Sequence, residues 1–345
     1  MGFGRYVTRR LVYMLILVFL IICFNFILFQ VLPFITSCPG RTYLQCAATL
    51  YVPPAPAHGA SSNASALTDH ERALVLSLYG FSNPLPVRFA TYVKNMFTFQ
   101  FGYNVGSLET GTVMHTITTR LPYTVILLGS STIAAFIIGI GLGVVAAAKR
   151  GKVLDVSSLA ILLFINSLPV FFLGAMLELS QLGLLGNFYV PIGTSTLAKT
   201  GLTYDLGFLR SLFLPFVTLT LAGIGGVFLT QRAVMIDTVA EDYILMARAK
   251  GLPERTVLYK HALRNAVLPI VTAFAISIGF ILSGAIITET VFGWPGLGLA
   301  IYLGILSLDF PLEQAIFFVI SLMVLIAVFL ADLIYGVLDP RVSTS

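Results

Sequence analysis

The chain has 345 residues, of which 57% are hydrophobic and only 10% are charged, whereas about 25% of residues are charged in a soluble domain. This composition excludes an ordinary soluble protein and indicates an integral membrane protein, for which the long apolar segments described below predict an all-α fold. The net charge is +5, but Lys and Arg are dispersed at the ends of apolar segments. Nucleic-acid binding is therefore not indicated, because it would need a dense basic patch.

Residues 1–32 are predicted to form a cytoplasmic N-terminus and a first transmembrane helix. Three Arg residues within the first ten positions precede an apolar run over 11–32, and about 20 apolar residues suffice to cross a bilayer. A cleaved signal peptide is the alternative. It is disfavoured because the run is too long and five more apolar segments follow.

Residues 33–121 are predicted to form an extracytoplasmic insertion. The stretch 51–66 is rich in Pro, Gly, Ser and Asn, which indicates a loop. Thr68-Asp69-His70-Glu71 has the form of a capping box, so a short helix is expected up to Tyr79. Leu74 stands where a zinc-binding His-Glu-x-x-His motif would need its second His, so no metal site is expected.

Two covalent modifications are considered in this insertion. Cys38 and Cys46 enclose a short loop in a compartment expected to be oxidising, which favours a disulfide over two free thiols. Asn63-Ala64-Ser65 is a glycosylation sequon, and Asn63 would be modified only if the host glycosylates its exterior.

Residues 122–341 are predicted to form a core of five further transmembrane helices, which gives six in all. They lie between Arg120 and Lys149, and over about 156–179, 208–231, 266–288 and 312–335. Glycines in the second and fourth spans predict close helix packing. Pro169 is expected to kink the third span, and Asp332 is expected to bond another helix rather than carry protons.

The distribution of basic residues predicts that both termini are cytoplasmic. Outside the long insertion, most Lys and Arg lie in the N-terminus and in the loops after the second and fourth spans. Loops of this kind remain inside under the positive-inside rule. The multi-pass protein is expected in the plasma membrane.

The loop 241–269, EDYILMARAKGLPERTVLYKHALRNAVLP, has more structure than a charged tether needs. Leu245, Met246, Ala249 and Leu252 follow helical spacing. Gly251 stands where a helix end requires positive φ, and Pro253 suits the start of a second helix. The loop is predicted to fold as two short helices with a glycine corner. A solvated basic loop is the alternative, but it would explain only the charge.

This order of residues resembles the "EAA" coupling loop of ABC importer permeases, and ARAKGL, HALRN and LP are similar to the oligopeptide/dipeptide (Opp/Dpp) branch. Within that branch, the long first outer loop and the TVFGWPGLG stretch resemble the B-type subunit. The stretch 289–298, ETVFGWPGLG, is a second match. The resemblance implies a type I ABC importer fold whose loop 241–269 couples to a cytoplasmic ATPase. The residues implied in this coupling are Glu241, Leu245, Ala247, Ala249, Lys250, Gly251, Leu252, Pro253, Leu268 and Pro269. Leu245 replaces the Glu that names the motif, and Leu308 replaces the Arg usual before Asp309.

The chain contains no G-x-x-x-x-G-K-[ST] motif, so it is expected to be non-catalytic and to bind no cofactor, with ATP and Mg²⁺ on partner subunits. The resemblance implies a permease subunit that forms half of a peptide translocation pathway. Its implied partners are a second, C-type permease, two ABC ATPases and an extracytoplasmic substrate-binding protein. The alternatives are the same role for oligosaccharides or nickel chelates, or an ion-coupled secondary transporter, for which no internal repeat is found.

Overall fold

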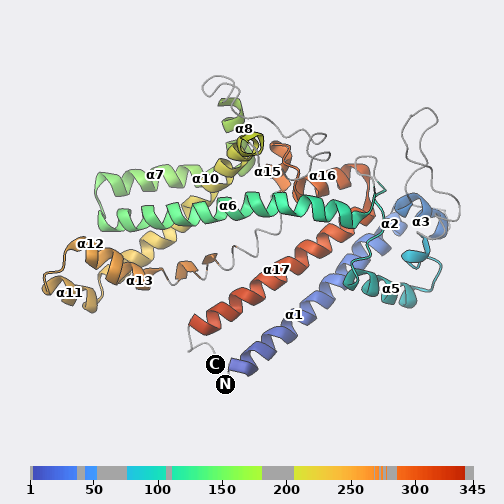
Figure 1. Cartoon of the computed structure of the whole chain (residues 1–345), viewed down its shortest axis with the longest axis horizontal. Helices are drawn as coiled ribbons and strands as arrows, with labels where there is room; N and C mark the ends of the chain where they lie inside the picture. Colours follow the sequence, from blue (N-terminus) through green and yellow to red (C-terminus); the bar gives the residue numbers. More distant parts are fainter. Residues whose placement is uncertain are drawn as a thin grey trace.

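A computed structural model of the chain describes residues 3–36, 43–52, 76–105, 111–180, 206–267, 269–271, 273–274, 277 and 286–338. Within these ranges nearly all regular structure is helical, and extended segments pair only at an isolated bridge between Tyr103 and Thr112. The long helices run between two ends of an elongated molecule (Figure 1). Helices α11 to α13 form one end, and α2, α3 and α5 form the other.

The first and last helices pack side by side (Figure 1). The N-terminal rod consists of α1 (Phe3–Phe26), a π-helical stretch (Ile27–Val31) and α2 (Leu32–Thr36), and the last helix is α17 (Phe310–Leu338). Their buried side chains share one hydrophobic core. Arg10 Nη1 and Asp332 Oδ2 lie 3.1 Å apart, so Asp332 has the interhelical partner that was expected.

The described part of the insertion is anchored to the first helix by a buried cation. Its helices are α3 (Tyr43–Tyr51) and α5 (Leu85–Phe97), and residues 76–78, the described end of the helix expected before Tyr79, are helical. Arg88 of α5 is only 3% exposed, and its guanidinium lies over the rings of Phe26 and Phe81. Its Nη2 donates to the carbonyl oxygen of Gln30 at 3.1 Å. Cation–π contacts and this bond hold the insertion in place.

The centre of the molecule is the pair α6 (Val113–Ala148) and α10 (Leu206–Val239). A Cβ on Gly139 would lie 2.8 Å from Cβ of Val227, and one on Gly143 would lie 2.8 Å from Cβ of Gln231. Only glycine lets the two helices approach this closely, as was predicted. Because α6 begins at Val113, the division between insertion and core at residue 121 falls inside a helix.

The third predicted span is broken rather than kinked, which corrects the sequence-based expectation. It consists of α7 (Val153–Ser167) and α8 (Val170–Ser180), which meet at 102°. Pro169 disfavours the helical conformation of the residue before it, and Leu168 adopts an extended one (φ −77°, ψ 134°). The helix therefore ends at Ser167 and restarts after the proline.

In the segment 290–308, Gly293, Pro295, Gly296 and Gly298 predict a loop because they disfavour a continuous helix, and this prediction is only partly correct. Helix α15 (Ile286–Val291) ends at a turn in which Gly293 has φ +59°, but an apolar helix α16 (Leu297–Ser307) follows. Gly298 lies inside α16, where a Cβ would come 2.7 Å from Cα of Ile286. The glycine thus permits contact between α15 and α16 instead of breaking the helix.

Four described helices are long and apolar enough to cross a membrane, and the bent pair α7–α8 would be a fifth span. The four cover Gly4–Ile35, Val113–Ala148, Gly207–Val239 and Phe310–Leu330. The remaining predicted span, 266–288, falls largely outside the described residues, although 269–271, 273–274 and 277 are helical. The structure is that of a multi-pass helical membrane protein.

Candidate functional site

The segment after α10 folds as the predicted pair of short helices with a glycine corner. The first is α11 (Asp242–Ala249); the second consists of α12 (Glu254–Thr256), a π-helical stretch (Val257–Ala262) and α13 (Leu263–Ala266). We call residues 241–269 the coupling segment. Gly251 has φ +74°, and its N–H donates to the carbonyl of Arg248 at 2.8 Å. Pro253 is the N-cap of the second helix. The π-helical geometry was not foreseen from the sequence.

The inner side of the coupling segment is part of the protein core. Ile244 of α11 and Val257 of the π-helical stretch are fully buried, as is Met235 of α10. They belong to one cluster with Val144, Ala247, Leu258, Ala262 and Ala266. This cluster therefore connects both short helices directly to α6 and α10.

The outer side of the coupling segment exposes large apolar side chains among its charged ones. Leu245 is 53% exposed, Met246 62% and Leu252 36%. Ala249, Lys250, Gly251 and Pro253 are exposed beside them, as are Glu241 and Pro269. Of the predicted coupling residues that the structure describes, only Ala247 is buried, and Leu268 lies outside the described residues. Large apolar side chains that stay exposed on one short, otherwise polar segment are typical of a surface that another protein covers.

Polar contacts fix the angle between the two short helices. Arg248 donates to Glu254 through Nη2 at 2.7 Å and Nε at 3.2 Å, and Asn265 Nδ2 donates to the hydroxyl of Tyr243 at 2.9 Å. The bond to Glu254 raises the pKa of the Arg248 guanidinium. Both members are largely exposed, so this pair adds little stability. Its role is to orient α11 relative to α12, since two parallel hydrogen bonds fix the direction of the guanidinium against the carboxylate.

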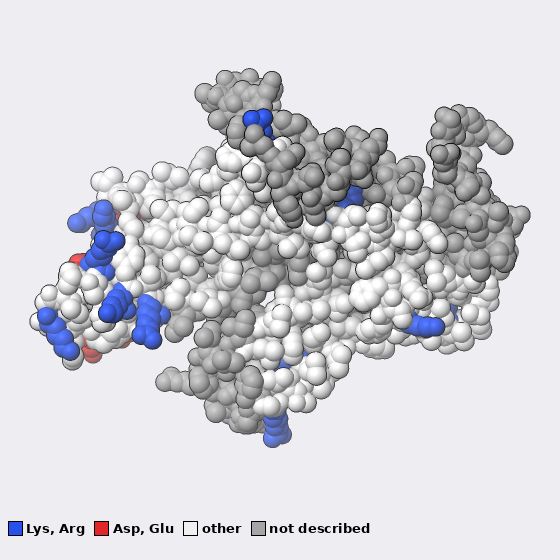
Figure 2. Space-filling view, in the orientation of Figure 1, with Lys and Arg blue, Asp and Glu red and all other residues white. Residues whose placement is uncertain are grey.

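Basic side chains surround this end of the molecule. Figure 2 shows Lys and Arg gathered over the coupling segment and the corner between α6 and α7. The exposed basic residues there are Lys149, Arg150, Lys152, Arg248, Lys250, Arg255, Lys260 and Arg264. Helix α1, which carries Arg5, Arg9 and Arg10 in its first turns, begins away from the insertion (Figure 1). This charge asymmetry is what the positive-inside rule describes.

The second matched stretch, 289–298, forms a buried polar junction at the other end of α6. The carboxylate of Glu289, which is fully buried, accepts from Thr124 Oγ1 at 2.9 Å and from the N–H of Leu299 at 3.0 Å. Trp294 Nε1 donates to the carbonyl of Tyr123 at 3.0 Å. This junction seats the start of α16 against α6. Asp309, which follows Leu308, accepts from the N–H of Leu312 and so caps α17.

A cavity of about 510 Å³ lies between α6, α10 and the described residues of the predicted fifth span. Ser131 and Thr132 line it from α6, Thr230 from α10, and Ser277 from the third side, among aliphatic neighbours. The lining described is uncharged. Sequence patterns alone did not indicate this cavity, because it forms between helices that are far apart in the chain.

The other predicted sites lie mainly outside the described residues. Cys46 is buried and disulfide-bonded, whereas Cys23 is free. Cys38, the partner predicted for Cys46, is not among the described residues, and neither is Asn63. The pairing and the glycosylation therefore stay predictions. The described part of the chain has no group of three or more His, Cys, Asp or Glu side chains that could hold a metal ion.

Comparison with known proteins decides the family. The family described as "Binding-protein-dependent transport system inner membrane component" matches residues 139–344, which include the coupling segment and the junction at Glu289. The chain belongs to this family. The permease therefore has the ABC importer fold that the resemblance in 241–269 implied.

Curated relatives match the permease over most of its length. The di/tripeptide transport system permease protein DppB of Pseudomonas aeruginosa is 31% identical over 78% of this chain and 84% of the relative. The oligopeptide transport system permease protein AppB of Bacillus subtilis is 32% identical over 80% and 86%. The metal-staphylopine import system permease protein CntB of Staphylococcus aureus (strain Mu50 / ATCC 700699) is 32% identical over 76% and 79%.

Proposed function

We propose that this permease subunit imports peptides and that its coupling segment docks on a cytoplasmic ATPase. The observation that carries the proposal is the two-sided packing of that segment. Its inner side is continuous with the core of α6 and α10, while Leu245, Met246 and Leu252 remain exposed on its outer side. An ATPase that covers the exposed face would shield these apolar groups from water. Its movement would reach the long helices through the buried cluster.

The proposed assembly contains a second, C-type permease, two ABC ATPases and an extracytoplasmic substrate-binding protein. The family's description as a binding-protein-dependent system supports the last of these. We assign the coupling segment and both termini to the cytoplasm, because basic residues gather over the coupling segment (Figure 2) and Arg5, Arg9 and Arg10 lie at the start of α1. In this assembly the permease performs no chemistry and binds no cofactor, and the ATPases hold ATP and Mg²⁺.

The proposed mechanism is alternating access. Closure of the ATPases displaces the coupling segment, and the tightly packed pair α6–α10 then tilts to open the pathway first outward and then inward. Docking biases this equilibrium only to the extent that its contacts differ between the two states. The cavity beside Ser131, Thr132 and Thr230 is our candidate for this subunit's wall of the pathway. Hydroxyl and aliphatic groups suit peptides of varied side chain, because they do not select one charge.

The names of the relatives make peptides the first candidate substrate and a metal chelate the second. Two of the relatives are named for di/tripeptide and oligopeptide transport, and one for metal-staphylopine import. Uptake into proteoliposomes that contain the whole importer separates the two. ATP-dependent uptake of tritiated trialanine without uptake of a nickel–histidine chelate is expected, and the reverse result would reassign the substrate.

Gly251→Trp tests the docking site without disturbing the chain's own packing. A Cβ at this position meets nothing within 4 Å, so the indole would project outward. The added cost within the chain is the strain of φ +74°, about 1–2 kcal/mol for a residue with a side chain. The variant should therefore insert and assemble with the second permease, but should lose the ATPases during affinity purification.

Gly111→Trp is the matched control for Gly251→Trp. Gly111 also has positive φ (+98°), and a Cβ there also meets nothing within 4 Å, but it belongs to the insertion. This control should keep the ATPases at the wild-type level. Retention of the ATPases and of uptake by Gly251→Trp would contradict the assignment of the coupling segment.

A further inference from the structure

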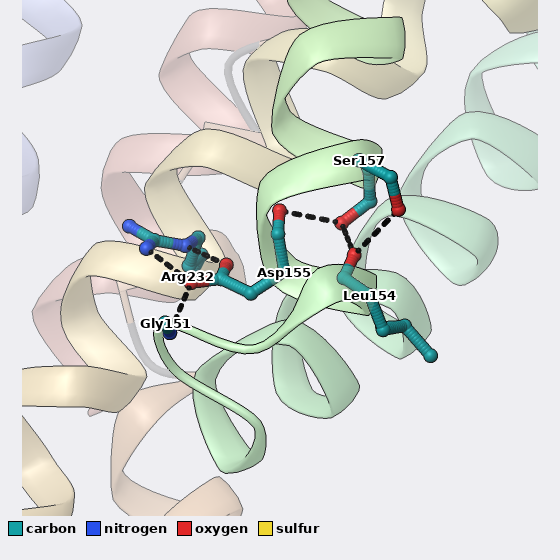
Figure 3. Close-up of polar contacts among 6 residues, drawn as sticks. Gly151, Leu154, Asp155, Ser157 and Arg232 are labelled. Atoms are coloured by element: carbon teal, nitrogen blue, oxygen red, sulfur yellow. Dashed lines mark hydrogen bonds and ion pairs between the residues drawn. The ribbon is translucent and has the colours of Figure 1, made fainter.

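A two-point ion pair joins the start of α7 to α10 (Figure 3). Asp155 lies in the first turn of α7 and is only 1% exposed. Its Oδ1 accepts from Arg232 Nε at 2.6 Å, and its Oδ2 accepts from Arg232 Nη2 at 2.8 Å. Oδ2 also accepts from the N–H of Gly151 at 3.0 Å. One carboxylate therefore holds the corner between α6 and α7, the start of α7, and the side of α10.

Such a pair is better explained by geometry than by stability. The Asp155 side chain is buried, whereas that of Arg232 is 21% exposed. Burial of a carboxylate offsets much of its attraction to a cation, so such a pair often adds little net stability. A guanidinium that binds a carboxylate through two bonds fixes distance and orientation together. Gly151 adds to this precision, because its φ of +75° turns its N–H toward Asp155. The arrangement therefore acts as a clamp between two helices.

The clamp lies next to the coupling segment. Arg232 is one helical turn before Met235, which is fully buried in the cluster with Ile244 and Val257. On the α6 side, a Cβ on Gly143 would lie only 3.1 Å from the backbone N of Arg232. The base of α10 is thus held by α6, by the α6–α7 corner and by the coupling segment.

We propose that Asp155 and Arg232 are positioning residues that make α6, α7 and the base of α10 move as one body when the coupling segment is displaced. This proposal rests on the proposed function. Without the clamp, α10 would shift against the α6–α7 corner. Movement of the coupling segment would then not be transmitted along α6 and α7. ATP would then be hydrolysed without transport. Neither side chain needs to contact substrate or ATPase for this role.

The test measures how much substrate is taken up for each ATP hydrolysed. The whole importer is placed in proteoliposomes, and tritiated trialanine and a nickel–histidine chelate are the probes. Asp155→Asn keeps the size of the side chain and removes its charge. We expect it to retain most of the ATP hydrolysis, and to lower uptake per ATP by about tenfold, within the range of coupling between linked sites. The double variant D155R/R232D restores an ion pair with the two charges exchanged. It should recover part of the uptake per ATP that Asp155→Asn loses.

The Arg10–Asp332 pair supplies a matched control. It also joins two helices through an Asp and an Arg, with Nη1 and Oδ2 3.1 Å apart, but it links α1 to α17. Asp332→Asn should leave uptake per ATP unchanged. An equal loss of the ratio in Asp332→Asn and Asp155→Asn would overturn the proposal, since the effect would then belong to any interhelical ion pair.

Each remaining outcome also supports or overturns the proposal. If Asp155→Asn does not accumulate, Arg232→Lys, which keeps the charge but loses the two-point geometry, takes its place. A wild-type ratio in the variant that accumulates would overturn the clamp while leaving the proposed function intact. Failure of both variants to accumulate would assign the pair to folding and overturn its role in coupling. A wild-type importer that binds no ATPase, or imports neither probe, would instead refute the proposed function.

Discussion

The exposed apolar face of the coupling segment should contribute a measurable share of ATPase affinity. Leu245 is 53% exposed and Met246 62% exposed. Full burial of a Leu or Met side chain stabilises by about 2 kcal/mol, so covering the exposed part of each contributes about 1 kcal/mol. The double substitution Leu245→Ala/Met246→Ala should then weaken docking by about 2 kcal/mol, which is about 30-fold in Kd. Since both side chains point outward, the fold should not change.

Titration of the purified ATPase onto the detergent-solubilised pair of permeases measures this Kd. Leu85→Ala is the matched control, because Leu85 is similarly exposed (56%) but lies on α5 in the insertion. The control should bind the ATPase as the wild type does. A Kd for Leu245→Ala/Met246→Ala within about twofold of wild type would correspond to less than about 0.5 kcal/mol. That result would mean that the ATPase does not cover this face.

Two further predictions concern the junction at the other end of α6, and thermal unfolding of the purified assembly measures both. Gly298→Ala should lower the midpoint, because its Cβ would lie 2.7 Å from Cα of Ile286 and overpacking costs about 1–3 kcal/mol. Gly129→Ala, where the Cβ meets nothing within 4 Å, should not lower it, and equal midpoints for the two variants would contradict the contact of α15 with α16. Trp294→Phe should cost at least about 1 kcal/mol, because it removes the bond to the Tyr123 carbonyl and part of a fully buried side chain. An unchanged midpoint would mean that this bond contributes nothing.

Much of the fold was predictable because the signals are local. The length of an apolar run sets a membrane span, and four of the predicted spans coincide with long helices. The coupling segment was predictable for the same reason. Gly251 is needed where the chain turns at positive φ, and Pro253 begins a helix, whatever surrounds them.

Other features depend on neighbours and were predicted incompletely. Pro169 indicated a disturbance of the third span, but the angle of 102° depends on what α7 and α8 pack against. Gly298 suggested a broken helix, yet it lies inside α16, where contact with Ile286 requires a glycine. The face of α11 that is buried could not be read from its spacing either, since Ile244 and Leu245 are adjacent and equally apolar.

The sequence by itself determined the membrane class, four of the six predicted spans and the helix–glycine–helix form of the coupling segment, because hydrophobic length and backbone preference act over a few neighbouring residues. Only the tertiary structure decided that Asp155 meets Arg232, 77 positions later, and that Thr124 meets Glu289, 165 positions later. Such pairs bring together groups that are distant in the chain, and the burial of the Asp155 and Glu289 carboxylates makes each depend on its partner. The side chains that connect the coupling segment to the long helices are therefore a property of the fold.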